Sequence, residues 1–426
     1  MLRFAQSPTG DMTIDDLRIA LLTYLAAKER GERFVVRIVD GDRRRNIEAK
    51  EREILEIMAL FGIPHDDTTY RSRNLTIHQH MAVKLLQTRK AFACFCSPET
   101  LEAQRKKAEE AGIPYRYDGC CENLTDAEVI DNPNPFTIRL KKPDASVTVE
   151  DLLHGIHRFD PETIDRFVIM DVEKYPTEDF ACAVDDMLQD ISLVFRGEEA
   201  LMSSARQVAV RDALGYDKKV RYAHLPPLCI AGGALPTVRS LLEEGYLPEA
   251  IVNWLLLPIL GEHGQEVFTL DEAQRRFRFE KLSQASVTLE IETLRTLNRE
   301  HIRRTDPKEL SRAFGFADAD IGELAKAFLE EGSTIAEIRP RIAAIFAPKS
   351  FEGSSNETME ALRSVLRRAP HFETYEAFFA YVSERTGLAN DALEQPLRLL
   401  LTGRETGPDL ASLYPHLKNY LQEIVK

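Results

Sequence analysis

Apolar residues change their spacing several times within the first sixty residues. Residues 2–5 predict a short buried strand, and apolar residues recur at helical spacing over 14–30. The run 34–39 is almost continuously apolar, which is typical of a parallel strand covered on both faces. Helical periodicity returns over 48–62. This strand–helix–strand–helix order predicts a doubly wound α/β sheet.

The pattern changes twice more along the chain. Residues 91–160 are rich in Cys, Pro and Asp, with short strand-like segments, and we expect an insertion into the sheet domain. The segments 168–170 and 191–195 predict strands that return to the main sheet. Beyond Gly245 apolar residues follow helical spacing almost throughout. The sequence therefore predicts an α/β N-terminal half and an all-α C-terminal half.

Composition and charge limit the classes of function. The 426 residues are 44% hydrophobic and 29% charged, which is ordinary for a globular protein. We expect a cytoplasmic protein with no membrane partner, because no apolar run approaches the ~20 residues that span a bilayer and the N-terminus lacks the pattern of a secretory signal. The net charge of −14 argues against nucleic-acid binding unless basic residues gather on one face.

Four of the six cysteines lie close together in the sequence, as Cys94-Phe-Cys96 and Cys120-Cys121. A C-x-C pair followed by further cysteine about 24 residues later fits the chemistry of a zinc site. Cys94, Cys96 and Cys121 are the candidate ligands of Zn²⁺, and the fourth ligand is open. The alternative is a group of reduced thiols in a small subdomain.

The chain opens with Phe4-Ala-Gln-Ser-Pro-Thr-Gly-Asp-Met-Thr-Ile-Asp-Asp-Leu-Arg18. This segment resembles the opening of the class I glutamyl-tRNA synthetase family, R-F-A-P-S-P-T-G-x-x-H-I-G-x-x-R. Three further segments resemble R-I-E-D-T-D, Y-P-T-Y-x-x-A-x-x-x-D-D and I-R-G-E-D-H of the family, at 37–42, 175–186 and 195–199. The resemblance spans nearly the whole chain, and it looks closest to the paralogous, tRNA-Gln-directed type of some bacteria.

The resemblance implies a Rossmann-type catalytic domain in two parts, 1–90 and 161–245, with an inserted acceptor-end domain at 91–160. It implies a helical stem-contact domain at 246–305 and a helical anticodon-binding cage at 306–426. It also implies a monomer that activates glutamate with ATP and Mg²⁺ and transfers it to tRNA-Glu or tRNA-Gln in protein biosynthesis.

The resemblance also assigns two sets of site residues. The glutamate pocket would comprise Arg3, Ser7, Val39, Glu178, Cys182 and Arg196. The ATP site would comprise Thr9, Thr13, Asp15, Arg18, Ala200 and Leu228. Arg3, Ser7 and Arg196 match residues that grip glutamate carboxylates in the family, and two arginines can form an effective fork. The alternative, which we favour, is that the arginines form residual buried ion pairs with Glu178 or Asp42.

Several positions depart from the family's pattern. The segment H-I-G-H is replaced by Thr13-Ile14-Asp15-Asp16, so Asp15 stands where a glycine lets the backbone approach the nucleotide. Asp15 and Asp16 bring negative charge toward a triphosphate, and one unit-charge pair at ~4 Å costs about 1 kcal/mol in water and about 4 kcal/mol at intermediate dielectric. No lysine occurs between Lys219 and Lys281, where the family has its mobile K-x-S-K-R loop.

The glutamate pocket departs from the family as well. Val39 replaces an acid that would hold the substrate's ammonium, and Glu178 replaces an aromatic residue and would repel glutamate. We therefore expect a pseudoenzyme in which glutamate activation and tRNA charging are impaired or lost, while tRNA or partner binding is retained. The alternatives are an active glutamate–tRNA ligase with diverged motifs and a structural or regulatory module without RNA contact.

Overall fold

The computed structural model describes residues 1–42, 44–261, 266–349 and 355–426. The chain divides into two compact units, each with a hydrophobic core of its own. The first unit contains Met1–Leu235 and Leu270–Thr288, and the second contains Pro236–Leu257 and Leu289–Lys426. Among the described residues, no helix has the length and apolarity needed to cross a membrane.

The first unit is built on a seven-stranded sheet with the order β3-β2-β1-β9-β10-β6-β7. Five of its strands run parallel in register, which confirms the α/β sheet expected from the sequence: β1 (Leu2–Gln6), β2 (Phe34–Ile38), β3 (Asp67–Tyr70), β9 (Leu193–Gly197) and β10 (Arg221–Leu225). The strand β6 (Val147–Asp151) continues the sheet beside β10, and β7 (Gly155–Phe159) closes it antiparallel to β6.

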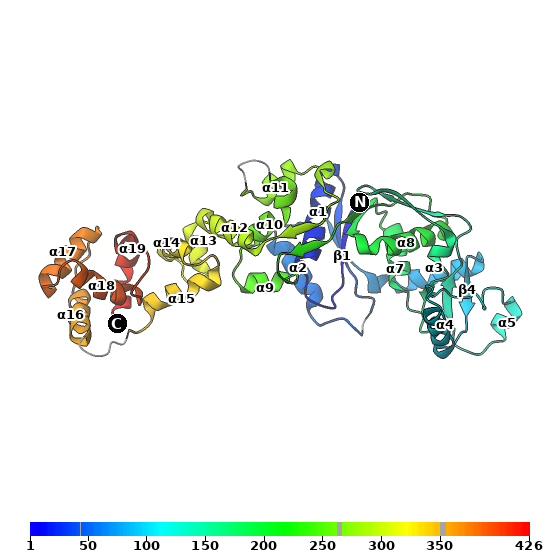
Figure 1. Ribbon diagram of the computed structural model, residues 1–426, viewed down its shortest axis with the longest axis horizontal. Coiled ribbons are helices and arrows are strands. Elements are labelled where there is room, and N and C mark those ends of the chain that lie inside the picture. Colours follow the sequence, from blue (N-terminus) through cyan, green and yellow to red (C-terminus); the bar gives the residue numbers. More distant parts are fainter. Residues whose placement is uncertain (43, 262–265, 350–354) are drawn as a thin grey trace. The chain divides into compact units, whose positions relative to one another are not determined.

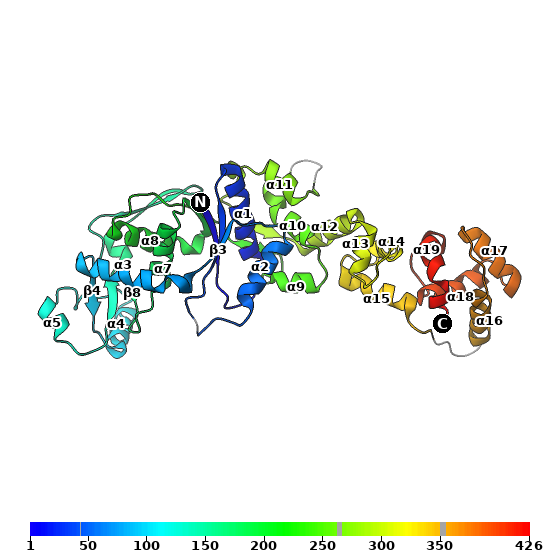
Figure 2. The same cartoon turned by 180° about the vertical axis from the view of Figure 1, so that it is seen from behind.

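Helices cover this sheet and begin where its strands end. The helix α1 (Ile14–Arg30) follows β1 and ends at Gly31, whose φ of 64° is the left-handed conformation that glycine adopts readily. The helices α3 (Leu75–Gln87), α7 (Glu178–Leu188) and α8 (Leu201–Leu214) lie side by side (Figures 1 and 2). Their inner faces bury apolar residues, among them Phe180, Val184 and Val210, against strand residues such as Val194.

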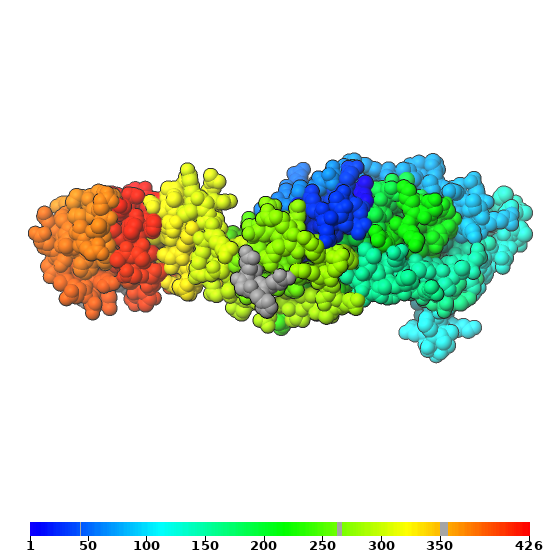
Figure 3. Space-filling view, turned by 90° about the horizontal axis from the view of Figure 1, so that it is seen from above, coloured from blue at the N-terminus to red at the C-terminus, as the bar shows by residue number. Residues whose placement is uncertain are grey.

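The predicted insertion, residues 91–160, begins with a segment, 91–140, that lies at one end of the first unit (Figures 1 and 3, cyan). It contains α4 (Pro98–Glu110), α5 (Asp126–Ile130) and a three-stranded sheet of the order β4-β5-β8. The strands are β4 (Ala91–Cys94), β5 (Thr137–Leu140) and β8 (Val168–Met170). Segment 168–170 was therefore wrongly predicted to return to the main sheet, because a three-residue apolar run contains no information about its partner. Segment 191–195 does return to the main sheet, although the strand β9 begins two residues later, at Leu193.

The second unit is helical, as the spacing beyond Gly245 predicts. Trp254, in α10, is fully buried, and its Nε1 donates to the Glu290 carbonyl (3.1 Å). The division into five domains remains a prediction. The helix α11 (Leu270–Arg276) belongs to the first unit. The other helices from this part of the chain are α9 (Val238–Glu243), α10 (Pro248–Leu260), α12 (Ile291–Arg304), α13 (Pro307–Arg312), α14 (Asp320–Ala327), α15 (Ile335–Phe346), α16 (Ser355–Arg367), α17 (Tyr375–Thr386), α18 (Asp391–Thr402), α19 (Leu410–Leu417) and α20 (Leu421–Ile424).

The remaining elements are short connections. In the first unit these are α2 (Lys50–Leu60), which follows β2, and α6 (Pro161–Ile164), which precedes β8. The strands β11 (Leu228–Ile230) and β12 (Val287–Leu289) form a separate two-stranded sheet. The pairing of these two strands was not predicted from the sequence.

One buried histidine of the second unit predicts a pH dependence of stability. Burial and the nearby Arg304 lower the pKa of His301 to about 4, and its Nε2 lies 3.0 Å from Asn253 Oδ1. A lowered pKa contributes stability above the ordinary pKa of about 6.5, and this contribution is lost as pH falls toward 4. Between pH 7 and 4, urea unfolding should therefore show an extra loss of about 2 kcal/mol that His301→Gln lacks.

The control for this measurement is His371→Gln, because His371 is exposed. We expect this variant to follow the pH profile of the parent chain. An acid-induced loss that is equal in the parent and in His301→Gln would contradict the assignment.

Candidate functional site

A cavity of about 700 Å³ lies at the carboxyl ends of the first parallel strands, within the first unit. Ser7 and Thr9 follow β1, Val39 follows β2, and Arg71 follows β3 directly. Glu178, the first residue of α7, lines the cavity from the other side. Open parallel sheets bind ligands at this edge. The structure thus brings together four of the predicted site residues, although Thr9 was assigned to the ATP site and the others to the glutamate pocket.

Arg3 does not line this cavity, because it is committed to a buried ion pair behind it. Its Nε and Nη2 donate to the two carboxylate oxygens of Asp186 at 3.0 and 3.1 Å, and Nη2 also lies 3.4 Å from Cys182 Sγ. Arg37 Nη1 donates to the same carboxylate at 2.6 Å. The interpretation of a residual buried ion pair fits Arg3, but its predicted partners, Glu178 and Asp42, were wrong.

The charges around Asp186 decide its protonation. Burial alone would raise the pKa of Asp186, but the positive charges of Arg3 and Arg37 outweigh burial and hold this pKa below its ordinary value. The carboxylate is therefore ionised and shared by two guanidinium groups. Sequence reasoning missed this role of Asp186, because the residues that meet here are far apart in the chain.

Arg71 is the buried cation of the cavity, and no motif in the sequence pointed to it. Its Nε donates to Asp185 Oδ2 at 3.1 Å, and its Nη1 donates to Glu178. Asp185 also accepts from Asn74 Nδ2 at 2.9 Å and contacts His78 Nε2 at 2.8 Å. The signal that could have identified Arg71 is its position directly after the third parallel strand.

A glycine makes room for this arginine. A Cβ atom at Gly41 would lie 3.3 Å from Arg71 Cδ, closer than an ordinary van der Waals contact. A methyl group at this position would require the Arg71 side chain to shift by a few tenths of an ångström. Gly41 belongs to the segment that follows β2, so Gly41 and Arg71 reach the cavity from the ends of neighbouring strands.

The N-terminus of α1 holds the residues assigned to the ATP site. Asp16 accepts from the backbone N of Thr13 at 2.8 Å and from its hydroxyl at 2.7 Å, while Thr13 Oγ1 accepts from the backbone N of Asp16. This capping box uses the carboxylate of Asp16 to begin the helix. The expectation that Asp16 only adds charge to a phosphate site was therefore incomplete.

Asp15 and Arg18 neutralise each other one turn along the same helix. Arg18 Nε donates to Asp15 Oδ1 at 2.8 Å, and Arg18 Nη2 donates to the Pro226 carbonyl at 2.7 Å. Burial raises the pKa of Asp15, and the charge of Arg18 opposes this shift only in part. The ion pair with Arg18 thus reduces the predicted repulsion between Asp15 and a phosphate. The same ion pair engages the Arg18 guanidinium.

Arg196 lies outside the cavity lining, on β9, in a network of side chains. Its Nη1 donates to Ser204 Oγ at 3.1 Å and to Gln207 Oε1 at 3.2 Å. Ser204 Oγ lies 2.8 Å from His224 Nε2, and His224 Nδ1 lies 2.7 Å from Asp151 Oδ2. Since Ser204, His224 and Asp151 are all buried, this series orients Arg196 and has no access to a substrate of its own.

The last two predicted ATP-site residues lie near this network. Ala200 ends a short 3₁₀ turn, and its carbonyl accepts from Ser204 Oγ at 3.2 Å. Leu228 begins β11 and is buried. The chain then reaches α9 at Thr237, whose hydroxyl accepts from the backbone N of Ser240. The connection between β11 and α9 therefore contains none of the lysines of the family's loop.

The cysteines of the insertion converge as the sequence predicts. Cys94, Cys96 and Cys121 each place a sulfur atom within 4.8 Å of the others. The Sγ of Cys120 lies 3.2 Å from Cys96 Sγ and 3.8 Å from Cys121 Sγ. Four sulfur ligands around Zn²⁺ at about 2.3 Å stand roughly 3.8 Å apart in a tetrahedron. Three of these sulfurs lie close enough to share one ion, and Tyr117 Oη lies among them, 3.4 Å from Cys94 Sγ and from Cys96 Sγ.

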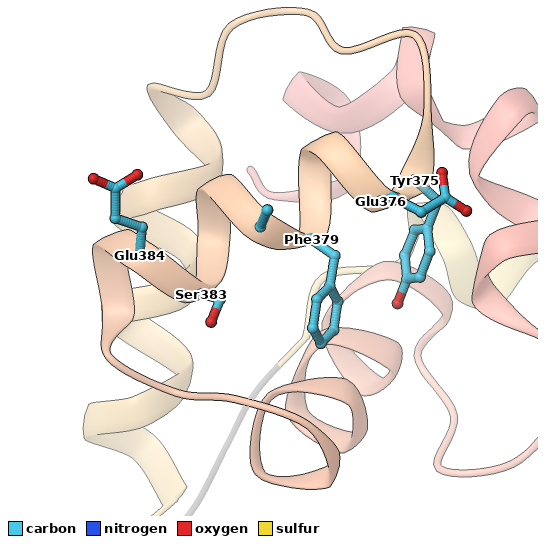
Figure 4. A pocket seen from close by; sticks show the side chains of 6 residues that line it. Tyr375, Glu376, Phe379, Ser383 and Glu384 are labelled. Atoms are coloured by element: carbon cyan, nitrogen blue, oxygen red, sulfur yellow. The ribbon is translucent and has the colours of Figure 1, made fainter.

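A second, shallower cavity lies on the helical unit along α17. Figure 4 shows Tyr375, Phe379 and Ser383 pointing to one side of this helix, whereas Glu384 points away. The rings of Tyr375 and Phe379 are 5.7 Å apart. Glu376 and Glu384 are the only charged residues that line it among those the structure describes, so it lacks a cation that could hold an anionic ligand.

Comparisons with known proteins agree with this architecture. Residues 1–296 match the family model of tRNA synthetases class I (E and Q), catalytic domain. A protein of Sulfurimonas denitrificans named glutamate–tRNA ligase 2 is 47% identical over 433 aligned residues, which cover all of both chains. The chain belongs to the class I glutamyl-tRNA synthetase family. The family resemblance of the opening segment is thereby confirmed.

Two further comparisons support this family assignment over the whole length of the chain. Glutamate–tRNA ligase 1 of a Nitratiruptor species is 43% identical, again over all of both chains. The crystal structure of a glutamate tRNA ligase from Elizabethkingia meningosepticum has a TM-score of 0.80 and 24% identity, and it covers 100% of this chain and 98% of that one. This structural likeness shows that the two proteins share the class I synthetase fold.

Proposed function

We propose that this member of the glutamyl-tRNA synthetase family binds tRNA but activates glutamate poorly or not at all. The observation that carries the proposal is the ion pair of Asp15 and Arg18 at the start of α1. The family resemblance places a glycine at Asp15 and a phosphate-facing arginine at Arg18. Here Asp15 brings a carboxylate into the first turn of the helix, and the Arg18 guanidinium is already bound to Asp15 and to the Pro226 carbonyl.

The missing lysines support the same proposal. Class I activation places positive charge on the phosphates as the adenylate forms, and electrostatic stabilisation of this kind is commonly the largest single contribution to catalysis. Removing one such group typically costs about 10²–10³ in rate. The chain has no lysine between Lys219 and Lys281 that could supply this charge.

The alternative is an active glutamate–tRNA ligase that uses ATP and Mg²⁺. Two observations favour it: the cavity at the carboxyl edge of the sheet, and full-length relatives that carry the name glutamate–tRNA ligase. In that case Arg196, with Ser204 and Gln207 orienting it, would bind glutamate. Magnesium would be held by the ATP phosphates, and carboxylates near α1 would complete its ligands.

Glutamate-dependent pyrophosphate exchange distinguishes the two proposals. We expect the parent chain to exchange at least about 10³-fold more slowly than the S. denitrificans relative, because both a phosphate-facing cation and the lysine loop are lost. A variant with Thr13→His, Asp15→Gly and an inserted K-x-S-K-R loop should recover exchange. The control carries the same changes with alanines in place of the inserted lysines. Pyrophosphate exchange by the parent chain at the rate of the S. denitrificans relative would contradict the proposal that glutamate activation is impaired.

We further propose that residues 91–160 contact the acceptor end of tRNA and that the helices of 246–305 and 306–426 contact its stem and anticodon. Filter binding of tRNA-Glu and tRNA-Gln to the full chain at several salt concentrations tests this proposal. Each tRNA phosphate that the protein neutralises releases counterions and so steepens the fall of affinity with rising salt. Absence of binding at low salt would favour a regulatory module without RNA contact. The proposed state in solution is a cytoplasmic monomer.

We propose that Cys94, Cys96 and Cys121 are ligands of Zn²⁺, with the fourth ligand open. Purified protein should contain about one zinc per chain by mass spectrometry, and Cys121→Ser should lose it, because structural zinc sites are four-coordinate. The control is Cys229→Ser, since Cys229 is exposed and lies outside the cluster. Thiol titration that finds all four cysteines reactive in the parent chain would contradict zinc binding.

A further inference from the structure

Arg71 has one donor that the protein leaves unused. The guanidinium is buried, with 4% of the side chain exposed, and its Nη2 has no hydrogen-bond partner among the described residues. Buried donors are normally satisfied, so an unpaired one in a cavity wall marks a place for an acceptor from outside the chain. Arg71 lines both the large cavity and an adjoining space of about 20 Å³.

The two carboxylates that hold Arg71 differ in exposure. Asp185 is fully buried and is engaged by Asn74 and His78 as well, so it fixes the guanidinium in place. Glu178 has 68% of its side chain exposed and binds only the outer Nη1. Only the Arg71 partner of this ion pair is buried, so water can reach the Glu178 carboxylate and replace it at Nη1. Glu178 is therefore the replaceable partner.

The chemistry of the cavity limits what can replace Glu178. A guanidinium with Nη1 and Nη2 available can bind both oxygens of one carboxylate, which is the strongest of its pairings. Three more acids line the cavity, Asp42, Asp171 and Glu173, against the exposed cations Arg44 and Arg45. This negative surplus disfavours a second carboxylate on the ligand and favours an ammonium group.

We propose that Arg71 binds the carboxylate of a small zwitterionic ligand, an α-amino acid, and that Glu178 occupies this position in the free protein. This inference depends on the proposed function in one respect: it takes the cavity as the amino-acid site of the synthetase fold. Binding requires the Glu178 carboxylate to leave Nη1 and rotate into solvent, so the chain competes with its own ligand. Removing the charge of Glu178 therefore strengthens binding.

Calorimetric titration of the full chain without ATP tests this exchange, with L-glutamine and L-glutamate as probes. Glu178→Gln should lower the Kd for L-glutamine at least tenfold relative to the parent chain. The double variant Glu178→Gln/Arg71→Gln should lose the gain. Glu162→Gln is the matched control, because Glu162 is an exposed glutamate, at 63%, that pairs with Lys142 on the same unit. This control should leave the Kd within twofold.

Arg71→Lys provides a second test should Arg71→Gln fail to fold, since lysine keeps the charge next to Asp185 but cannot form the two-point contact. In the Glu178→Gln background it should remove most of the gain. The proposal is overturned if Glu178→Gln binds both probes within twofold of the parent, or if the gain survives either change at Arg71. These titrations need no adenylate, so their outcome is independent of the exchange assay.

Discussion

Replacing Asp186 by asparagine should destabilise the first unit by about 3–5 kcal/mol, because it leaves two buried guanidinium groups without a counter-charge. Arg3 and Arg37 both donate to the carboxylate of Asp186, and all three side chains are buried. The amide of asparagine keeps the size of the side chain but can accept with only one oxygen. Urea unfolding followed by circular dichroism at pH 7 measures the loss.

Asp190→Asn is the matched control for this substitution. Asp190 is exposed and pairs with Lys218 at 2.8 Å, and an exposed pair contributes roughly 0–1 kcal/mol. Its unfolding midpoint should stay close to that of the parent chain. If Asp186→Asn also unfolds like the parent, Asp186 is not the counter-ion on which Arg3 and Arg37 depend.

A methyl group at Gly322 should destabilise the second unit by about 3 kcal/mol or more, because it meets backbone that cannot move aside. A Cβ atom there would lie 1.9 Å from the Pro307 carbonyl oxygen, where α14 packs against α13. Alanine is otherwise favoured over glycine inside a helix by about 1 kcal/mol. The steric overlap with Pro307 must cost more than this gain in helix propensity. Whether Gly322→Ala lowers or raises the stability therefore tests directly how closely the two helices approach.

Scanning calorimetry of Gly322→Ala should show a lower midpoint for the transition of the helical unit. Gly10→Ala is the control, because a Cβ atom at Gly10 would have no heavy atom within 4 Å. A midpoint for Gly322→Ala that equals or exceeds that of the parent would mean that α13 and α14 do not approach each other this closely.

The sequence was sufficient for the parts of the fold that depend on local pattern. The strands at 34–39 and 191–195 were found because runs of apolar residues are a property of the strand itself. The capping box of Thr13 and Asp16 and the pair of Asp15 and Arg18 were equally local, three residues apart. Residue types alone do not distinguish a carboxylate that caps its own helix from one that faces a ligand, because both occur at helix N-termini.

The rest of the site depends on contacts between distant parts of the chain. Arg71 meets Glu178 across 107 residues, and Arg3 meets Asp186 across 183. No spacing rule predicts which acid a buried arginine will reach, because the answer depends on the order of strands in the sheet. The same reason explains why segment 168–170 was assigned to the wrong sheet.

The strand β6 has a practical consequence for anyone who wishes to shorten this protein. It lies within the predicted insertion and pairs with β10. Excising the whole predicted insertion would therefore make β10 an edge strand with unpaired backbone amides and carbonyls. Exposed edge strands can pair with other chains and promote aggregation. A trimmed version that stays soluble has to keep residues 147–159, including the carboxylate of Asp151 that reaches His224.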